Sequence, residues 1–312
     1  YFPEKHGFGV NLGGSHRGQP PSYFSPYGLP TLSDGPKGEY LTDREAEEAA
    51  RFIERHKDRP FFLYVPFHAV HTPLQARKEL VEKYERRKPP EGGGRFKPAY
   101  AAMIESLDAA VGRILRALEE AGVAGRTVVV FTSDNGGLVS STSNAPLRAG
   151  KGSWYEGGVR VPLLVRGPGI GPAGSVRETP VITMDLYPTI LELAGVRIPA
   201  GQVVDGESLV PLVRGSGGLS RDALFWHYPH YHPGGATPYG AVRKGDLKLI
   251  ESYEDGSLEL YDLVRDPGEA ENLAAQRPDT ARELRSLLDK WRRSVGAQMP
   301  SPNPDDDPRA PK

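Results

Sequence analysis

Two neighbouring residues with oxygen-bearing side chains, Asp134 and Asn135, closely follow the apolar run Thr127 to Phe131. The run is typical of a buried strand, and α/β sheets bind ligands beyond the carboxyl ends of their strands. Carboxylate and amide oxygens are the hard ligands that Ca²⁺ or Mg²⁺ prefers. Asp-Asn-Gly-Gly is also good turn chemistry, so a plain turn is the alternative. The position after the strand favours the metal site.

A second candidate is the glycine-rich segment 147–160, which contains the cations Arg148, Lys151 and Arg160. The backbone amides of such a segment and a lysine ammonium can both point at a tetrahedral oxyanion. The order of residues differs from that of a P-loop, so a nucleotide site is not indicated. A flexible surface loop with solvated charges is the alternative.

Imidazoles supply the remaining candidates. His68 and His71 follow the apolar run Phe61 to Val65, and without a third ligand their spacing forms no zinc signature. A general acid or an oxyanion donor is the functional interpretation. The aromatic and histidine-rich segment Trp226 to Pro233 suits sugar or aryl recognition, or else a buried corner.

The order of apolar patterns predicts the elements that position these residues. A strand, a helix with apolar spacings of three and four, and a second strand imply a βαβ unit and hence an α/β fold. A capping box, Thr42 with Glu45, predicts the start of an earlier helix. The expected elements are strands Phe61–Val65, Thr127–Phe131, Val161–Val165 and Thr179–Ile182, and helices from Thr42 to about Lys57, Ala101–Leu118 and Asp185–Leu193.

Beyond the linker-like residues 214–218 the pattern changes to short runs separated by turns, which favours a small antiparallel sheet followed by a helix. The expected strands are Ala223–Trp226, Tyr239–Arg243, Leu247–Glu251 and Leu258–Tyr261. We therefore expect an α/β domain over residues 1–215, an α+β subdomain over 216–299 and a disordered tail over 300–312.

The overall composition excludes several classes of function. The 312 residues carry 39 Lys and Arg against 40 Asp and Glu, so the charge balance indicates neither a nucleic acid nor an anionic membrane as partner. No apolar run reaches the roughly 20 residues that span a bilayer. The absence of Cys excludes disulfides and thiolate ligands within these residues. The oligomeric state stays open.

Taken together, the segments resemble the sulfatase family, whose members have the alkaline-phosphatase-like α/β fold, a sheet with flanking helices. Ser-Asp-Asn-Gly-Gly, Leu-Arg-Ala-Gly-Lys-Gly and Glu-Gly-Gly-Val-Arg are specific in combination. The matching stretches are Phe61 to Leu74, Tyr100 to Leu118, Val130 to Gly137, Pro146 to Pro168 and Leu260 to Leu273.

The resemblance implies a role for each candidate. Asp134 and Asn135 would bind the family's calcium, with Mg²⁺ as the lesser alternative, and Lys151 would contact the sulfate and the ester oxygen. His71 would face the leaving group. The residues expected to bind substrate are Arg148, His16 and His230.

The sequence also departs from the family's pattern. The paired-aspartate motif, the Cys-x-Pro-x-Arg or Ser-type motif that yields formylglycine, and Gly-Lys-Trp-His are absent from these residues. We therefore expect an N-terminally incomplete sulfatase that is inactive alone. Family members are expected to be periplasmic, extracellular or lysosomal.

The resemblance implies that the intact enzyme hydrolyses sulfate esters of carbohydrates or aryl compounds, with formylglycine as nucleophile and calcium assistance. Two alternatives remain. One is a phosphatase or phosphotransferase of the same superfamily, and the other is a non-catalytic protein that binds sulfate or glycans.

Overall fold

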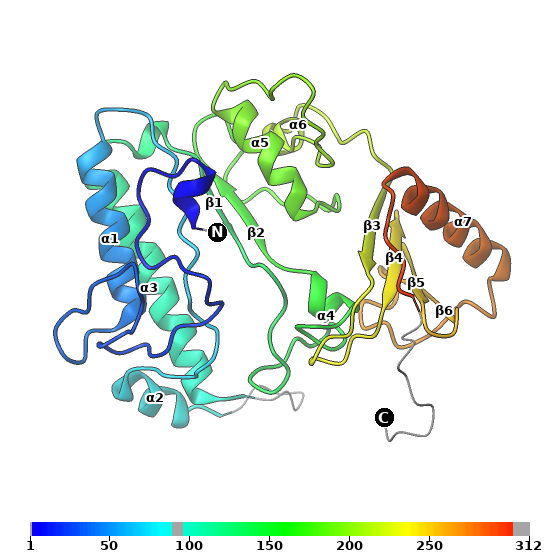
Figure 1. The fold of residues 1–312 in the computed structure, drawn as a ribbon, viewed down its shortest axis with the longest axis horizontal. Coiled ribbons are helices and arrows are strands. Elements are labelled where there is room, and N and C mark those ends of the chain that lie inside the picture. The colour runs from blue at the N-terminus through cyan, green and yellow to red at the C-terminus, as the bar shows by residue number, and fades with distance from the viewer. Residues whose placement is uncertain (1, 89–95, 302–312) are drawn as a thin grey trace. The chain divides into compact units, whose positions relative to one another are not determined.

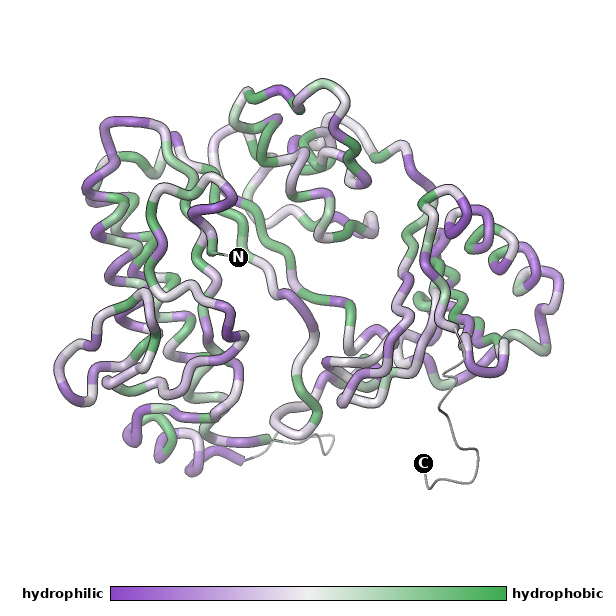
Figure 2. The backbone as a smooth tube through the Cα atoms, in the orientation of Figure 1, coloured by the Kyte–Doolittle hydropathy of each residue, from purple (hydrophilic) through white to green (hydrophobic). Residues whose placement is uncertain are grey.

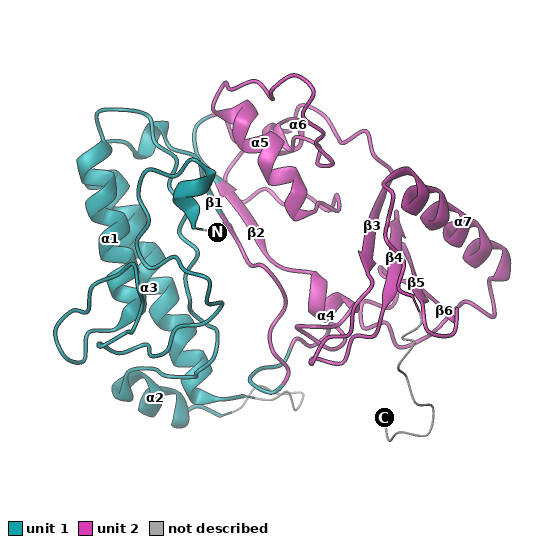
Figure 3. Cartoon of the chain, in the orientation of Figure 1, with its two compact units in different colours: residues 1–130, 140–143, 166–168 teal, residues 131–139, 144–165, 169–312 magenta. Residues whose placement is uncertain are grey.

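The computed structural model describes residues 2–88 and 96–301, which form two compact units (Figures 1 and 3). The first unit comprises residues 1–130, 140–143 and 166–168, and the second comprises residues 131–139, 144–165 and 169–312. The predicted boundary at residue 215 stays a prediction. The predicted tail lies almost wholly outside the described residues.

The helices of the first unit pack through small and branched apolar side chains. Ala50 and Ile53 of α1 form a buried cluster with Ala117 and Leu118 of α3. The predicted helix 101–118 is confirmed within α3. Helix α3 ends at Glu120, and Gly122, two residues later, has the left-handed φ of 68° that is common after a helix. The elements of this unit are η1 (Pro3–His6), α1 (Leu41–His56), α2 (Lys78–Glu85), α3 (Pro98–Glu120) and η2 (Ala124–Arg126).

Buried tyrosines hold the irregular N-terminal segment of the first unit in place. The Tyr23 side chain is fully buried, and its hydroxyl lies 2.6 Å from the carbonyl oxygen of His68 and 2.9 Å from that of His71. The Tyr40 hydroxyl donates to the carbonyl oxygen of Gln75 at 2.9 Å. Residues 68–75, which contain the two predicted histidines, are therefore held by the hydroxyls of two tyrosines that belong to a hydrophobic cluster.

Three local predictions are wrong. Phe61–Val65 is not a strand in the described structure, and Phe62 and Tyr64 are exposed by 56% and 65%. An apolar run signals burial, but a strand also needs a neighbour to complete its hydrogen bonds. Thr179–Ile182 is likewise not a strand. Helix α1 begins at Leu41 with Tyr40 as its N-cap, so Thr42 lies inside the helix and forms no capping box; Glu45 pairs with His68.

Strand β1 (Val129–Thr132) confirms the predicted strand 127–131, shifted toward the C-terminus. It forms a two-stranded sheet with β2 (Leu163–Arg166), where a strand was also predicted. Both strands are hydrophobic along most of their length (Figure 2). The predicted helix 185–193 is α5 (Leu186–Leu193). The short elements of the second unit are α4 (Glu156–Val159), η3 (Thr183–Asp185) and α6 (Val210–Arg214).

The C-terminal part of the second unit is a four-stranded antiparallel sheet with helix α7 (Pro278–Ser294) on one face (Figure 1). Leu284 and Leu288 of α7 pack on the sheet, and Trp291 stacks on Phe225 with centroids 4.9 Å apart. The strands, in spatial order, are β3 (Ala223–Tyr228), β4 (Tyr239–Lys244), β5 (Leu247–Ser252) and β6 (Leu258–Asp262). All four were predicted.

The other face of this sheet carries a second apolar cluster that includes Tyr239, Ile250 and Tyr261. Trp154 and Tyr155 of the glycine-rich segment pack against it. The sheet therefore supports one of the predicted sites directly. None of the described helices is long and apolar enough to cross a membrane.

Candidate active site

The turn that carries Asp134 and Asn135 begins two residues after the end of β1. The Ser133 hydroxyl donates to the carbonyl oxygen of Asn135 at 2.9 Å, and the Asn135 amide nitrogen donates to that of Gly136 at 3.0 Å. The Asp134 side chain is exposed. The turn therefore leaves the Asp134 carboxylate and the Asn135 amide oxygen available to a ligand.

Backbone hydrogen bonds join this turn to the glycine-rich segment. The amide of Gly136 donates to the carbonyl oxygen of Gly158 at 3.0 Å, and the amide of Lys151 donates to that of Gly137 at 3.1 Å. A Cβ atom at Gly150 would lie 2.2 Å from the carbonyl oxygen of Gly137, so the approach requires glycine. The two segments predicted as separate candidates thus form one structure.

Asn144, which the sequence did not indicate, also links the turn to the glycine-rich segment. Its side-chain oxygen accepts from the amide of Gly137 at 2.9 Å. Its side-chain nitrogen donates to the carbonyl oxygens of Gly137 at 2.8 Å and Ala149 at 2.9 Å. A single Asn in a loop gives no sequence signal for such a bridge.

A buried ionic cluster links the glycine-rich segment 147–160 to strand β5. Lys248 of β5 is 1% exposed, and its ammonium lies 3.0 Å from Glu156 Oε1 and 2.8 Å from Glu269 Oε1. Glu269 also accepts from the amide of Glu156 at 2.6 Å. Burial raises the pKa of the Glu269 carboxyl, although Lys248 lowers it in part. The only sequence signal was a lysine within the apolar strand run Leu247 to Ile250.

Arg148 is occupied by contacts within its own unit. Its guanidinium donates to the carbonyl oxygen of Glu269 at 2.7 Å and to the Tyr261 hydroxyl at 3.1 Å. It also lies over the Tyr155 ring, 3.7 Å from the centroid. These contacts give Arg148 a positioning role, and its role in binding substrate stays a prediction.

The histidine loop belongs to the first unit. His71 Nδ1 lies 3.0 Å from the carbonyl oxygen of Thr72, which as an acceptor favours the proton on Nδ1 and leaves Nε2 as the acceptor in the neutral ring. His68 Nδ1 lies 2.6 Å from Glu45 Oε1. Burial raises the pKa of the Glu45 carboxyl, and the contact with His68 opposes that shift. His68 is thus a structural partner, which leaves His71 as the candidate.

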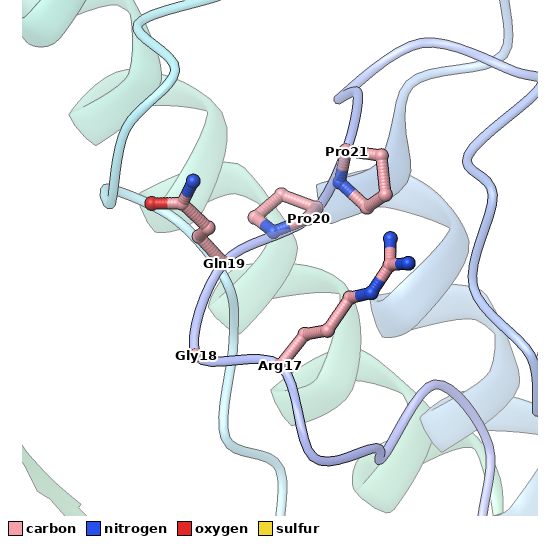
Figure 4. A pocket seen from close by; sticks show the side chains of 5 residues that line it. All are labelled: Arg17, Gly18, Gln19, Pro20 and Pro21. Atoms are coloured by element: carbon pink, nitrogen blue, oxygen red, sulfur yellow. The ribbon is translucent and has the colours of Figure 1, made fainter.

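His16 is exposed and precedes a hollow lined by residues 17–21 (Figure 4). In this hollow the Arg17 side chain lies beside Pro21, whereas Gln19 points away from it. The Thr72 hydroxyl lies 3.4 Å from Gln19 Oε1, which connects the hollow to the histidine loop. The role of His16 in binding substrate stays a prediction.

His230 is also exposed, and its ring stands edge-on to that of Tyr228 with 5.4 Å between centroids.

Backbone hydrogen bonds join the segment that carries Asp134 and Asn135 to the segment that carries Lys151, and both segments belong to the second unit. His71 and His16 lie in the first unit, and their part in the same site stays a prediction.

The kind of donor fits a hard cation. The Asp134 carboxylate and the Asn135 amide oxygen are ligands that suit Ca²⁺, which takes roughly six to eight oxygens. Across residues 2–88 and 96–301, no three His, Cys, Asp or Glu side chains cluster to hold a metal. These two residues would thus supply part of a calcium site.

Two protein-family models match this chain, and together they cover residues 4–294. The family model described as Sulfatase matches residues 4–196, and that described as N-sulphoglucosamine sulphohydrolase, C-terminal, matches residues 150–294. A protein of Formosa agariphila named sulfatase is 40% identical over 288 residues, which cover 84% of this chain and 52% of that protein. The steryl-sulfatase of Mus musculus is 35% identical over 301 residues, 85% of this chain and 46% of the relative. The chain thus spans about half the length of the curated relatives it matches.

Among solved structures, Ps i-CgsB in complex with k-i-k-neocarrahexaose superimposes with a TM-score of 0.76 at 30% identity. The match covers 96% of this chain and 69% of that chain. The fold of the described residues is therefore that of a sulfatase-like α/β structure with a C-terminal antiparallel sheet.

Proposed function

Because the chain belongs to the sulfatase family, we propose that the protein hydrolyses sulfate esters at a site that includes Asp134, Asn135 and Lys151. The observation that carries the proposal is the backbone hydrogen bonding between the two segments: the Lys151 amide donates to the carbonyl oxygen of Gly137, two residues after Asn135. The proposed site would bring together a carboxylate, an amide oxygen and an ammonium. Such a set suits a substrate that carries a tetrahedral oxyanion.

Calcium is the metal that we propose for this site, held by Asp134 and Asn135 together with further oxygens. When bound, it would supply positive charge next to the sulfate group. The turn would contribute by holding the backbone next to both ligand residues, since Gly136 and Gly137 are each hydrogen-bonded to neighbouring segments.

Lys151 and His71 would act on the ester oxygen. The Lys151 ammonium would bind the sulfate and stabilise the negative charge that develops on the oxygen as the sulfur–oxygen bond breaks. As an imidazolium, which carries a proton on Nε2 as well as on Nδ1, His71 would donate the Nε2 proton to that leaving oxygen as a general acid. A formylglycine, formed from Cys or Ser, supplies the attacking nucleophile in this family, and the 312 residues contain neither of the motifs that yield it.

Sulfated carbohydrate is the substrate class that we propose, with His230, His16 and Arg148 among the residues that contact it. The likeness to Ps i-CgsB, solved with k-i-k-neocarrahexaose, supports a saccharide. The likeness to steryl-sulfatase favours an aryl or steryl ester as the second candidate. The complete fold that we propose is the alkaline-phosphatase-like sheet with flanking helices.

The test uses the full-length protein with 4-nitrophenyl sulfate, 4-nitrophenyl phosphate and k-i-k-neocarrahexaose. Sulfate release, measured by ion chromatography, is expected from the sulfate substrates, with little phosphate release. Preferential hydrolysis of the phosphate would identify a phosphatase instead. Binding of the saccharide without any release would identify a non-catalytic glycan-binding protein.

A further inference from the structure

The ring of His232 lies directly against the backbone beside Lys151, although nothing in the sequence distinguished it from the other histidines of its loop. A Cβ atom at Gly152 would lie 2.1 Å from His232 Nδ1, and one at Gly234 would lie 2.7 Å from the carbonyl oxygen of Lys151. Both glycines therefore permit a backbone-to-ring approach that any larger residue would block.

Backbone hydrogen bonds fix this approach. The amide of Ala236 donates to the carbonyl oxygen of Gly152 at 3.1 Å, and the amide of His232 donates to that of Ala236 at 2.8 Å. Ala236 is 5% exposed and belongs to the apolar cluster on which Trp154 and Tyr155 also pack. The loop 232–236 is thus a rigid neighbour of the lysine, in the same unit.

The hydrogen bond made by one ring nitrogen decides the role of the other. The amide of Gly234 donates to His232 Nδ1 at 2.8 Å, so Nδ1 is an acceptor without a proton. In the neutral ring the proton must then be on Nε2, which is a donor. Within residues 2–88 and 96–301, Nε2 of His232 has no hydrogen-bond partner. The ring is partly buried, and its hydrogen bond with Gly234 constrains its orientation. Its Nε2–H can therefore donate to a ligand.

We infer that His232 recognises the part of a saccharide next to the sulfate, in addition to the contact proposed for the more exposed His230. Its Nε2–H donates a hydrogen bond to a hydroxyl or ring oxygen of the sugar whose sulfate contacts Lys151. The inference deepens the proposed function and rests on it. A steryl or nitrophenyl group offers no such oxygen, so His232 discriminates between the two substrate classes.

Two substitutions separate the ring nitrogens. His232→Asn places an amide oxygen near the position of Nδ1, so it can still accept from Gly234, but it removes the Nε2 donor. His232→Gln places an amide near the position of Nε2, so it retains a donor there. His56→Asn is the matched control, because His56 lies on α1, where its Nδ1 is 2.8 Å from the carbonyl oxygen of Phe52 and its ring stacks on the Phe52 ring.

The kinetic experiment measures kcat/KM of the full-length protein for k-i-k-neocarrahexaose and for 4-nitrophenyl sulfate. The expected result for His232→Asn is a loss of about five- to tenfold on the saccharide and less than about twofold on the aryl ester. His232→Gln should recover part of the loss, and His56→Asn should change neither value. Equal effects of His232→Asn on both substrates would overturn the inference while leaving the proposed function intact.

A second measurement is independent of activity. Nitrogen-15 correlation spectra of the imidazoles, taken where the rings are neutral, should show the proton of His232 on Nε2. His56, whose Nδ1 donates to a carbonyl oxygen, should show the opposite tautomer. A proton on Nδ1 of His232 would refute the inference directly. Failure of the wild-type protein to release sulfate from either substrate would refute the proposed function and, with it, the substrate assigned to His232.

Discussion

The amide of Gly136 donates a hydrogen bond to the carbonyl oxygen of Gly158, with 3.0 Å between the two atoms. A Cβ atom at Gly136 would lie 1.8 Å from the carbonyl oxygen of Gly157. The turn that carries Asp134 and Asn135 can therefore reach helix α4 only without a side chain at this position.

We predict that Gly136→Ala destabilises the protein by about 1 to 3 kcal/mol, because the backbone must move to admit the methyl group. Activity should fall further, since the same movement displaces Asp134. Urea denaturation and sulfate release measure the two effects. Gly218→Ala is the control, because no atom lies within 4 Å of its Cβ position. Equal stability of the two variants would contradict the close approach.

We predict that Lys248→Met lowers the free energy of unfolding by about 3 to 5 kcal/mol, because it removes the buried cation that lies 2.8 Å from Glu269 and 3.0 Å from Glu156. Glu156 then keeps only its longer contact with Arg243, at 3.7 Å. Lys244→Met is the matched control. The Lys244 ammonium is partly exposed and lies 3.5 Å from Glu283 and 3.9 Å from Asp222, so its loss should cost at most about 1 kcal/mol. Similar losses for the two variants in urea denaturation would show that the buried cluster is not a stabilising unit.

Asp185 gives a prediction that depends on pH. Burial alone would raise the pKa of its carboxyl, but hydrogen bonds from Arg221 and from the amides of Ile182 and Glu207 outweigh burial and lower the pKa. A lowered pKa in the folded state contributes stability above the unfolded value of about 3.9, and the contribution is lost as pH falls through the folded value. The stability gap between wild type and Asp185→Asn should therefore be widest near neutral pH and should narrow in acid. A gap independent of pH would refute this.

The C-terminal sheet could be predicted because its signals are local. Short strand-forming runs separated by turns such as Lys244-Gly245-Asp246 indicate hairpins. Gly245 takes the positive φ of 58° that this turn needs. The run Phe61–Val65 was misjudged because strand formation depends on a neighbour, which a single apolar run does not reveal.

The candidate site was predictable only in part, for a similar reason. Asp134, Asn135 and Lys151 came from motifs and from the family resemblance, which report chemistry at single positions. The bridge made by Asn144, the buried Lys248 cluster and the approach of His232 to Gly152 join residues that are distant in sequence or lack any motif. Their geometry arises from packing, which periodicity does not encode.

We predict that Lys151→Ala in the full-length protein lowers kcat more than it raises KM, because the ammonium is most useful when negative charge develops on the leaving oxygen. Steady-state kinetics with 4-nitrophenyl sulfate measures the split. Lys244→Ala, at a partly exposed position on β4, should leave both constants unchanged. A change confined to KM would assign Lys151 to substrate binding alone.

The central claim is that Asp134 belongs to a calcium site that serves sulfate-ester hydrolysis, and one measurement tests it most directly. Sulfate release from 4-nitrophenyl sulfate is followed for the full-length protein and for Asp134→Ala, across a calcium titration after chelation. Asp222→Ala, which removes an exposed carboxylate, is the control. We predict that calcium restores the activity of wild type and of Asp222→Ala, whereas Asp134→Ala stays inactive even at saturating calcium. Full turnover by Asp134→Ala, or activity that is indifferent to chelation, would contradict it.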